Sequence, residues 1–152
     1  MKRPTDFIES NVNLYKGQLL ICDSYLYEIA MARCWEEVAG EGFGQIDYKY
    51  MVRSFCPEKT LLDIFGFKMS TVLRLGRVAK IVVFTKDGSP HSLQIPLAVQ
   101  EAAENVGFPK DKISYFVLEK DKVHAVSDAA VRMARHLSEI QAAIGRSANA
   151  ST

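Results

Sequence analysis

The stretch KIVVFTKDGSPHSLQIP, residues 80–96, decides the fold because it can be interpreted in two ways. Residues 80–85 form an apolar, β-branched run that is typical of a buried strand. The pair Asp87-Gly88 follows, and it tolerates the positive φ that a tight type I′ hairpin requires. Pro96 argues against a helix over this region, because a proline in a helix interior kinks or breaks it. We therefore predict that the chain reverses at residues 87 and 88.

This hairpin places Phe84 opposite His91. Because side chains alternate along a strand, four apolar residues then share one face, namely Val82, Phe84, Leu93 and Ile95. A helix is expected to begin at Pro96 and to end before Gly107.

The alternative interpretation makes residues 80–85 a parallel strand that leads into a helix starting near Ser89. The fold would then be a three-layer α/β/α open sheet. Residues 87–92 would lie at a helix N-terminus, where backbone N–H groups can donate hydrogen bonds to a phosphate.

A similar unit follows, with a strand over 113–118, a polar turn over 119–122 and a returning strand over 123–126. Ser127 is the expected N-cap of a helix whose apolar side comprises Ala130, Met133, Ala134, Leu137 and Ile140. Ile81 and Phe84 recur 32 residues later as Ile113 and Phe116, which indicates either a degenerate repeat or a shared composition of buried residues. Two consecutive strand-turn-strand-helix units predict an α+β fold, a mainly antiparallel sheet with helices packed on it.

The first half of the chain is less regular. We expect a strand over 18–22, a helix from Asp23 or Ser24 to Gly40, and a strand over 45–55. A second helix is predicted to open at Pro57 and to be interrupted by Gly66, with another helical stretch over 70–75. The expected organisation is a flexible arm (1–17), a single domain (18–144) and a disordered tail (145–152).

Composition excludes few functions. The 19 Lys and Arg residues nearly balance the 18 Asp and Glu residues, so the net charge of +1 disfavours nucleic acid as a partner. Cys22, Cys34 and Cys56 are an odd number of cysteines without CxxC spacing, which favours reduced thiols and argues against a zinc site. With no secretory signal or membrane-spanning run, the expected location is cytoplasmic, and no motif identifies a cofactor or metal.

The richest group of polar side chains is Lys86, Asp87, Gly88, Ser89, His91 and Ser92. As a ligand site, this group would bind a small anion, with a lysine charge, backbone access at the glycine and hydroxyl donors. The spacing is neither that of a Walker loop nor GxGxxG, and the same residue types are ordinary at a solvated hairpin tip.

Three residues are candidate catalytic groups. Cys22 lies where a strand meets a helix start, a place that can lower a thiol pKa. His91 and His124 would lie on returning strands of the two hairpins and could face each other as an acid–base pair or a metal site.

Residues 58–80 also suit a helix-turn-helix with Gly66 at the turn and a wing at residues 87 and 88. Lys68, Arg74, Arg77 and Lys80 would then contact phosphates. Our main expectation is instead a small binding or accessory domain that self-associates or binds a protein partner. The alternatives are an enzyme that uses Lys86 and His91 on an anionic metabolite, and a winged-helix DNA-binding regulator.

Overall fold

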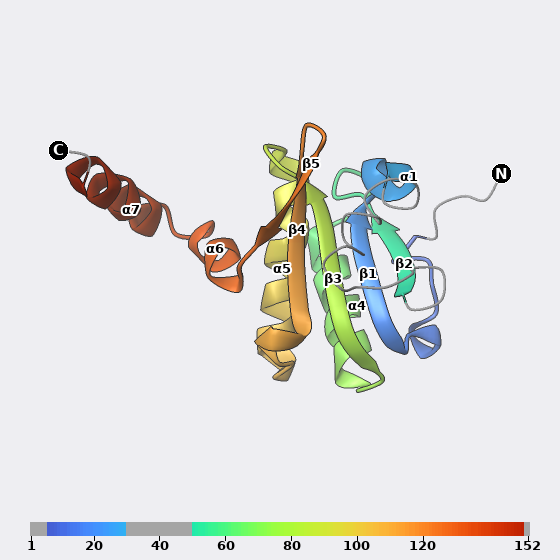
Figure 1. The fold of residues 1–152 in the computed structure, drawn as a ribbon. Coiled ribbons are helices and arrows are strands. Elements are labelled where there is room, and N and C mark those ends of the chain that lie inside the picture. The colour runs from blue at the N-terminus through green and yellow to red at the C-terminus, as the bar shows by residue number, and fades with distance from the viewer. Residues whose placement is uncertain (1–5, 30–49, 151–152) are drawn as a thin grey trace.

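Five strands form one sheet in the computed structural model, which describes residues 6–29 and 50–150 (Figure 1). Their spatial order is β2-β1-β3-β4-β5. The first four in chain order run parallel, and β5 is antiparallel to β4. Their bounds are β1 (Gly17–Asp23), β2 (Tyr50–Phe55), β3 (Val78–Lys86), β4 (Ile113–Glu119) and β5 (Lys122–Val126).

The predicted hairpin at residues 87 and 88 is wrong. The chain passes from β3 directly into helix α5 (Pro90–Val106), and β3 pairs with β4 in parallel. Gly88 does adopt a positive φ of 83°, but that conformation turns a strand into a helix instead of reversing it. The sheet is therefore mostly parallel, as the alternative interpretation has it, and the predicted antiparallel pair with its shared face does not form.

Pro96 lies inside α5 and is buried. An interior proline costs a helix about 3 kcal/mol. The buried stripe of α5 starts before this residue, with Ile95 followed by Val99 and Ala102 at helical spacing. Because fully burying one large aliphatic side chain contributes about 1.5–3 kcal/mol, the stripe offsets the proline.

The similarity at an offset of 32 residues has a simple structural counterpart. Ile81 is the register partner of Ile113, and Phe84 is that of Phe116, across the parallel β3–β4 pair. Neighbouring parallel strands place register partners on the same face, where both members need apolar side chains.

Helix α4 (Leu62–Arg74) is continuous, so the predicted interruption at Gly66 and the separate stretch over 70–75 are wrong. Pro57 lies in a turn before the helix and does not open it. Phe65, Met69 and Val72 form one buried stripe across the glycine. This packing outweighs the roughly 1 kcal/mol that a glycine costs inside a helix.

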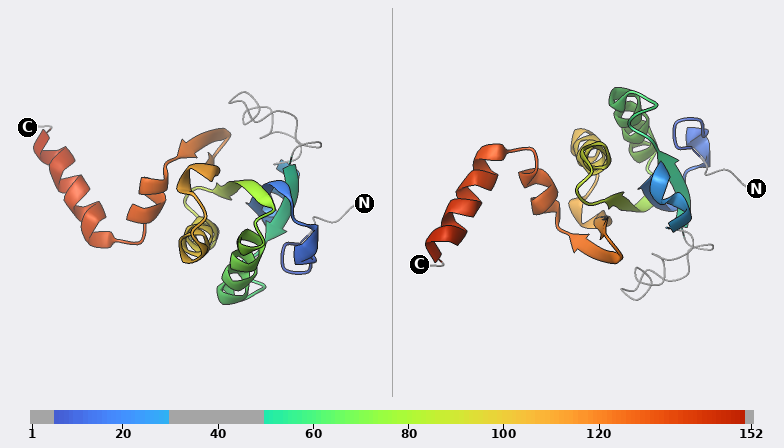
Figure 2. Two further views of the ribbon diagram at one scale, coloured as in Figure 1. Left: turned by 90° about the horizontal axis from the view of Figure 1, so that it is seen from below. Right: turned by 90° about the horizontal axis from the view of Figure 1, so that it is seen from above.

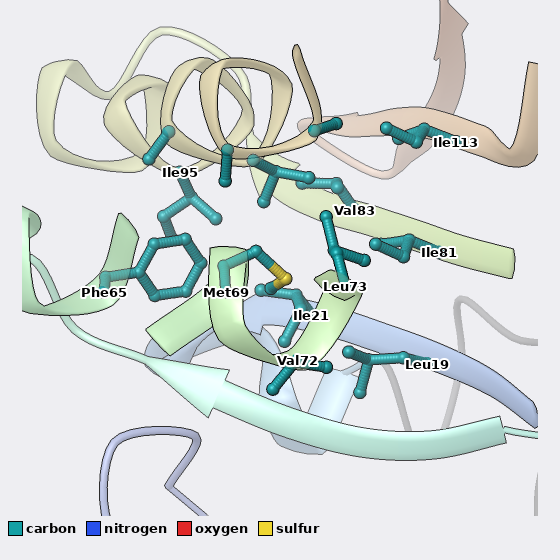
Figure 3. Close-up of a cluster of buried hydrophobic side chains, with 14 of the residues drawn as sticks. Leu19, Ile21, Phe65, Met69, Val72, Leu73, Ile81, Val83, Ile95 and Ile113 are labelled. Carbon is teal, nitrogen blue, oxygen red and sulfur yellow. The ribbon is translucent and has the colours of Figure 1, made fainter. Parts of the chain in front are cut away.

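Helices α4 and α5 cover the same face of the sheet (Figure 2). They pack on apolar residues of β1, β3 and β4, among which Ile21, Ile81 and Ile113 are seen in Figure 3. A second buried cluster, centred on Leu20 and Phe84, lies on the opposite face.

The strands of the N-terminal half agree with expectation where the structure describes them. β1 confirms the strand predicted over 18–22, and β2 accounts for the described part of the strand predicted over 45–55. The helix predicted from Asp23 or Ser24 begins as a 3₁₀ turn, η2 (Ser24–Leu26), and continues as α1 (Tyr27–Ile29). The remainder of that helix, together with Cys34, lies outside the described residues.

The C-terminal part begins as predicted, with the antiparallel β4–β5 hairpin and an N-cap in which Ser127 accepts the N–H of Ala130 at 3.0 Å. The single helix expected there is instead two, α6 (Asp128–Met133) and α7 (Leu137–Ala150). Helix α7 includes residues 145–150 of the predicted tail and projects away from the sheet (Figures 1 and 2). No helix in the described part of the chain is both long and apolar enough to span a membrane.

Candidate functional site

The carboxyl ends of β1 and β3 lie side by side at one edge of the sheet, which we call the carboxyl edge. From β1 the chain continues to β2 on one side, and from β3 it continues to β4 on the other. Such a divergence is the topological switch point, where open α/β sheets most often bind ligands. Here it lies between Asp23, the last residue of β1, and the segment that follows β3.

Asp23 and Ser92 connect the two strand ends. One carboxylate oxygen of Asp23 accepts the Tyr25 N–H at 3.0 Å, and the other accepts the Ser92 hydroxyl at 2.9 Å. The same Ser92 oxygen accepts the Lys86 N–H at 3.0 Å. Both side chains are buried, so this contact helps to hold the start of α5 against β1.

The N-terminus of α5 is already capped by the chain itself. Pro90 has no N–H to offer, and Ser89 accepts the Ser92 N–H through its hydroxyl and the Leu93 N–H through its carbonyl. The carboxylate of Asp23 also supplies negative charge beside this helix end. An anion at this position would compete with groups that are already in place, so ligand binding by residues 86–92 stays a prediction.

A second group of side chains surrounds this edge. The Nε2 atom of His91 lies 3.5 Å from the Oε1 atom of Glu58, and both side chains are about half exposed. The carboxylate of Glu58 raises the pKa of Tyr25, and Cys56 adds to this effect. No sequence pattern marks Tyr25 or Glu58, and the position of Asp23 after a buried strand is the available signal for this edge.

The three candidate catalytic residues are not brought together as a pair of histidines with a thiol. Cys22 is fully buried, and burial raises the pKa of its thiol, so it remains protonated and unreactive at neutral pH. His91 lies on α5 instead of a returning strand. His124 lies on β5, where its Nε2 atom is 3.2 Å from Glu119.

Two further expectations find little support in the geometry. Because α4 is continuous and residues 87 and 88 form no hairpin, the two helices and the wing of the DNA-binding alternative are not formed in residues 58–80. Lys68 donates to the carbonyls of Ile8 and Ser10, within the chain. Within residues 6–29 and 50–150, no three His, Cys, Asp or Glu side chains gather to hold a metal ion.

A hollow lies on the helical face of the sheet, between α4 and α5. This groove has a volume of about 570 Å³. Phe67 lines it while remaining 77% exposed, and Gly66 contributes no side chain to it. Its other lining residues are Leu62, Asp63, Ser70, Leu97, Ala98, Glu101, Ala102, Asn105 and Arg135.

Arg135 belongs to the connection between α6 and α7, and it fixes that connection to the groove. Its Nη2 atom donates to the carbonyl of Leu97 at 2.7 Å. Its Nε atom is buried and has no hydrogen-bond acceptor among the described residues. The groove wall therefore includes an unsatisfied donor, which is uncommon in native structures.

The helix that follows Arg135 leaves its own apolar side chains in solvent. Leu137 is 79% exposed and Ile144 is 57% exposed. Among the described elements, α6 is the neighbour with which α7 makes more than isolated contacts. Leu137 and Ile140 belong to the apolar side expected for the helix after Ser127, but the sequence could not show that Leu137 and Ile144 would be left exposed.

Comparisons with protein-family models, with curated proteins and with solved structures find no match for this chain, so any function has to be inferred from its own residues.

Proposed function

We propose that this chain is a protein-binding module that self-associates through α7. The observation that supports this proposal is the apolar stripe of α7, formed by Leu137, Ile140 and Ile144 at helical spacing, of which Leu137 and Ile144 are exposed. An apolar stripe on a helix normally packs against another surface. In the described chain, no such surface covers Leu137 or Ile144.

The length of α7 supports the same conclusion. Isolated helices shorter than about 12–15 residues are marginal in water, and α7 has 14 residues. Most helical stability in proteins comes from packing of an amphipathic face. Burial of each large aliphatic side chain would contribute about 1.5–3 kcal/mol, so a partner surface would stabilise α7 as a helix.

The overall charge of the chain permits association of identical copies. With a net charge of +1, two copies repel each other only weakly. A net charge near zero generally promotes association, because long-range repulsion is lost. The cytoplasmic location expected from the sequence stays a prediction.

The test compares molar masses by size-exclusion chromatography with light scattering over a range of concentrations. We expect the full chain to reach the mass of a dimer and a chain that ends at His136 to remain monomeric. The double variant Leu137→Ser/Ile144→Ser should also be monomeric, whereas Glu139→Gln, on the polar side of α7, should still dimerise. A full chain that remains monomeric throughout would refute self-association.

A second candidate function is the binding of a small anionic ligand at the carboxyl edge. Its support is the position of Lys86 and His91 at the switch point of the sheet. Titration with inorganic phosphate, followed by amide NMR, should then shift the signals of Lys86, Ser89 and His91, and Lys86→Ala should weaken the effect. Unchanged spectra would remove this candidate.

A further inference from the structure

We propose that α7 of one copy docks into the groove between α4 and α5 of a second copy, in a reciprocal exchange that forms a two-fold symmetric dimer. This inference rests on the proposed function and names the surface that α7 binds. It combines two features of one chain, an amphipathic helix whose apolar side is left exposed at Leu137 and Ile144 and an open groove lined in part by apolar side chains. A helix in a groove is a common mode of recognition between proteins.

The dimensions of the helix and of the groove agree. At about 1.5 Å per residue, the 14 residues of α7 extend for about 21 Å. The groove runs between α4 with 13 residues, or about 20 Å, and α5 with 17 residues, or about 26 Å. Helix α7 can therefore lie along the two helices as a third helix on this face.

The surfaces also agree in chemistry. At about 100° per residue, Leu137, Ile140 and Ile144 fall on one side of α7, while Glu139 and Arg146 fall on the opposite side. Docking through the apolar side buries no charge of α7, and both charged groups remain in water. The groove offers apolar side chains in return, from Leu62, Phe67, Leu97 and Ala98, beside polar ones from Asp63, Ser70, Glu101, Asn105 and Arg135.

Gly66 gives the groove room for a close approach. A Cβ atom added at this residue would meet no atom within 4 Å apart from its chain neighbours and the nearby backbone of its own helix. The backbone of α4 is thus open where Gly66 lines the groove, and a docked side chain can reach it there. Phe67, next to it, would change from 77% exposed to covered.

The connection before α7 favours exchange between copies over docking within one chain. Only Arg135 and His136 separate Ala134, the C-cap of α6, from Leu137, the first residue of α7. Arg135 is held at the carbonyl of Leu97, and from there α7 leads away from α4 and α5 of its own chain (Figure 2). A short hinge that opposes folding back favours domain swapping, and reciprocal exchange closes such an assembly at two copies.

The decisive variant fills the groove at Gly66. Gly66→Leu places a branched side chain in the open space and keeps a good helix former in α4, so the fold is preserved. Gly66→Ala is the matched control, because its methyl group leaves the groove open. We expect the dimer dissociation constant to rise about 30-fold or more for Gly66→Leu, as for loss of a hot-spot contact, and to change little for Gly66→Ala.

A mixing experiment then tests the exchange itself. The Gly66→Leu chain keeps α7 but has a blocked groove, and the chain ending at His136 keeps the groove but has no α7. Each should be monomeric alone, with unchanged far-UV circular dichroism of the domain. Mixed together, they should form a 1:1 complex with one helix in one groove.

The possible failures point to different conclusions. If Gly66→Leu dimerises as tightly as the unmodified chain, α7 binds another surface, and the inference fails while the proposed function stands. If the two variants do not combine, the exchange is also refuted. If the full chain is monomeric and Gly66→Leu exposes the α7 amides to exchange, α7 docks within its own chain, and both proposals fail.

Discussion

The two ends of the chain flank the same sheet but differ in how they are held. The N-terminal segment, residues 6–15, buries Phe7 and Tyr15 in the main core. The C-terminal arm, α6 and α7, leaves Leu137 and Ile144 exposed. The sequence alone suggested a flexible N-terminal segment, yet it is this end that contributes two of the largest buried side chains.

The two ends are held differently because they carry different apolar side chains that can reach the core. The ring of Phe7 lies 5.4 Å from that of Tyr15 and 5.2 Å from that of Phe65, so the segment is fixed by aromatic packing. The arm is attached by polar contacts and by buried Val131. Among the polar contacts, Gln100 donates to Asp128 at 3.0 Å and Arg135 donates to the carbonyl of Leu97 at 2.7 Å. A terminal segment is thus integrated by bulky apolar side chains that reach the core, whatever its overall polarity.

The largest expected effect is on the N-terminal segment. Phe7→Ala should lower the free energy of unfolding by about 3–5 kcal/mol, because it leaves a cavity among buried rings. Leu137→Ala, in the arm, should change that free energy by less than about 0.5 kcal/mol under conditions where the chain is monomeric. Urea denaturation measures both. Equal effects at the two positions would remove the contrast between the ends.

A smaller effect is expected at the polar contacts that attach each end. Lys68 donates to the carbonyls of Ile8 and Ser10, and its ammonium group lies 5.4 Å from the centre of the Phe7 ring. We expect Lys68→Met to lower the free energy of unfolding by about 1–2 kcal/mol, since hydrogen bonds from a charged donor are lost.

The matched change at the arm is Gln100→Met. This substitution removes the hydrogen bonds that Gln100 donates to Asp128. It also removes the Oε1 atom of Gln100, which is buried without a donor among the described residues, so the two effects offset each other. The net change should therefore stay below about 1 kcal/mol. A larger loss for Gln100→Met than for Lys68→Met, by urea denaturation, would mean that the arm is the more firmly attached end.

The smallest effect at neutral pH concerns one buried tyrosine near each end. Burial raises the pKa of Tyr15 and that of Tyr115 above the ordinary value of 10.0. Above pH 10 the unfolded chain therefore releases these protons more readily than the folded chain, and stability falls as the pH rises. Below pH 10 both states keep the protons, and this stabilisation is fully present.

The variant Tyr115→Phe separates the contribution of Tyr115 to the pH dependence from that of Tyr15. The Tyr115 hydroxyl is buried and has no hydrogen-bond partner among the described residues, so its removal should be neutral or slightly stabilising at pH 7. The variant should also lose less stability than the unmodified chain as the pH rises from about 10 to about 12. Urea denaturation curves across this pH range measure the free energy of unfolding of both proteins. If this free energy fell equally with pH in both, titration of Tyr115 would not contribute to the pH dependence.

Local patterns predicted the strands better than their direction. Residues 18–22, 80–85 and 113–118 are short apolar runs, and each is part of a strand. The direction of pairing depended on residues 87 and 88, where positive φ at a glycine serves a hairpin and a strand-to-helix turn equally well. Pro96 was given too much weight, because the buried stripe around it was assigned to two elements instead of one.

The candidate surfaces likewise can be predicted from the sequence only where their residues are close together in the chain. The polar segment after β3 is visible in the sequence because its residues are contiguous, from Lys86 to Ser92. The groove is not visible, because it forms between Phe67 on α4 and Leu97 on α5, thirty residues apart. Phe67 does lie off the buried stripe of Phe65 and Met69, and an exposed aromatic residue on a helix was the available signal.

The most direct test of reciprocal docking is amide hydrogen exchange of residues 137–150 at low and at high protein concentration. If α7 is stabilised by the groove of a second copy, these amides should exchange rapidly in dilute solution and become protected as the dimer forms, while β3 stays protected throughout. Protection of α7 that does not depend on concentration, or exchange that stays rapid at every concentration, would contradict the account.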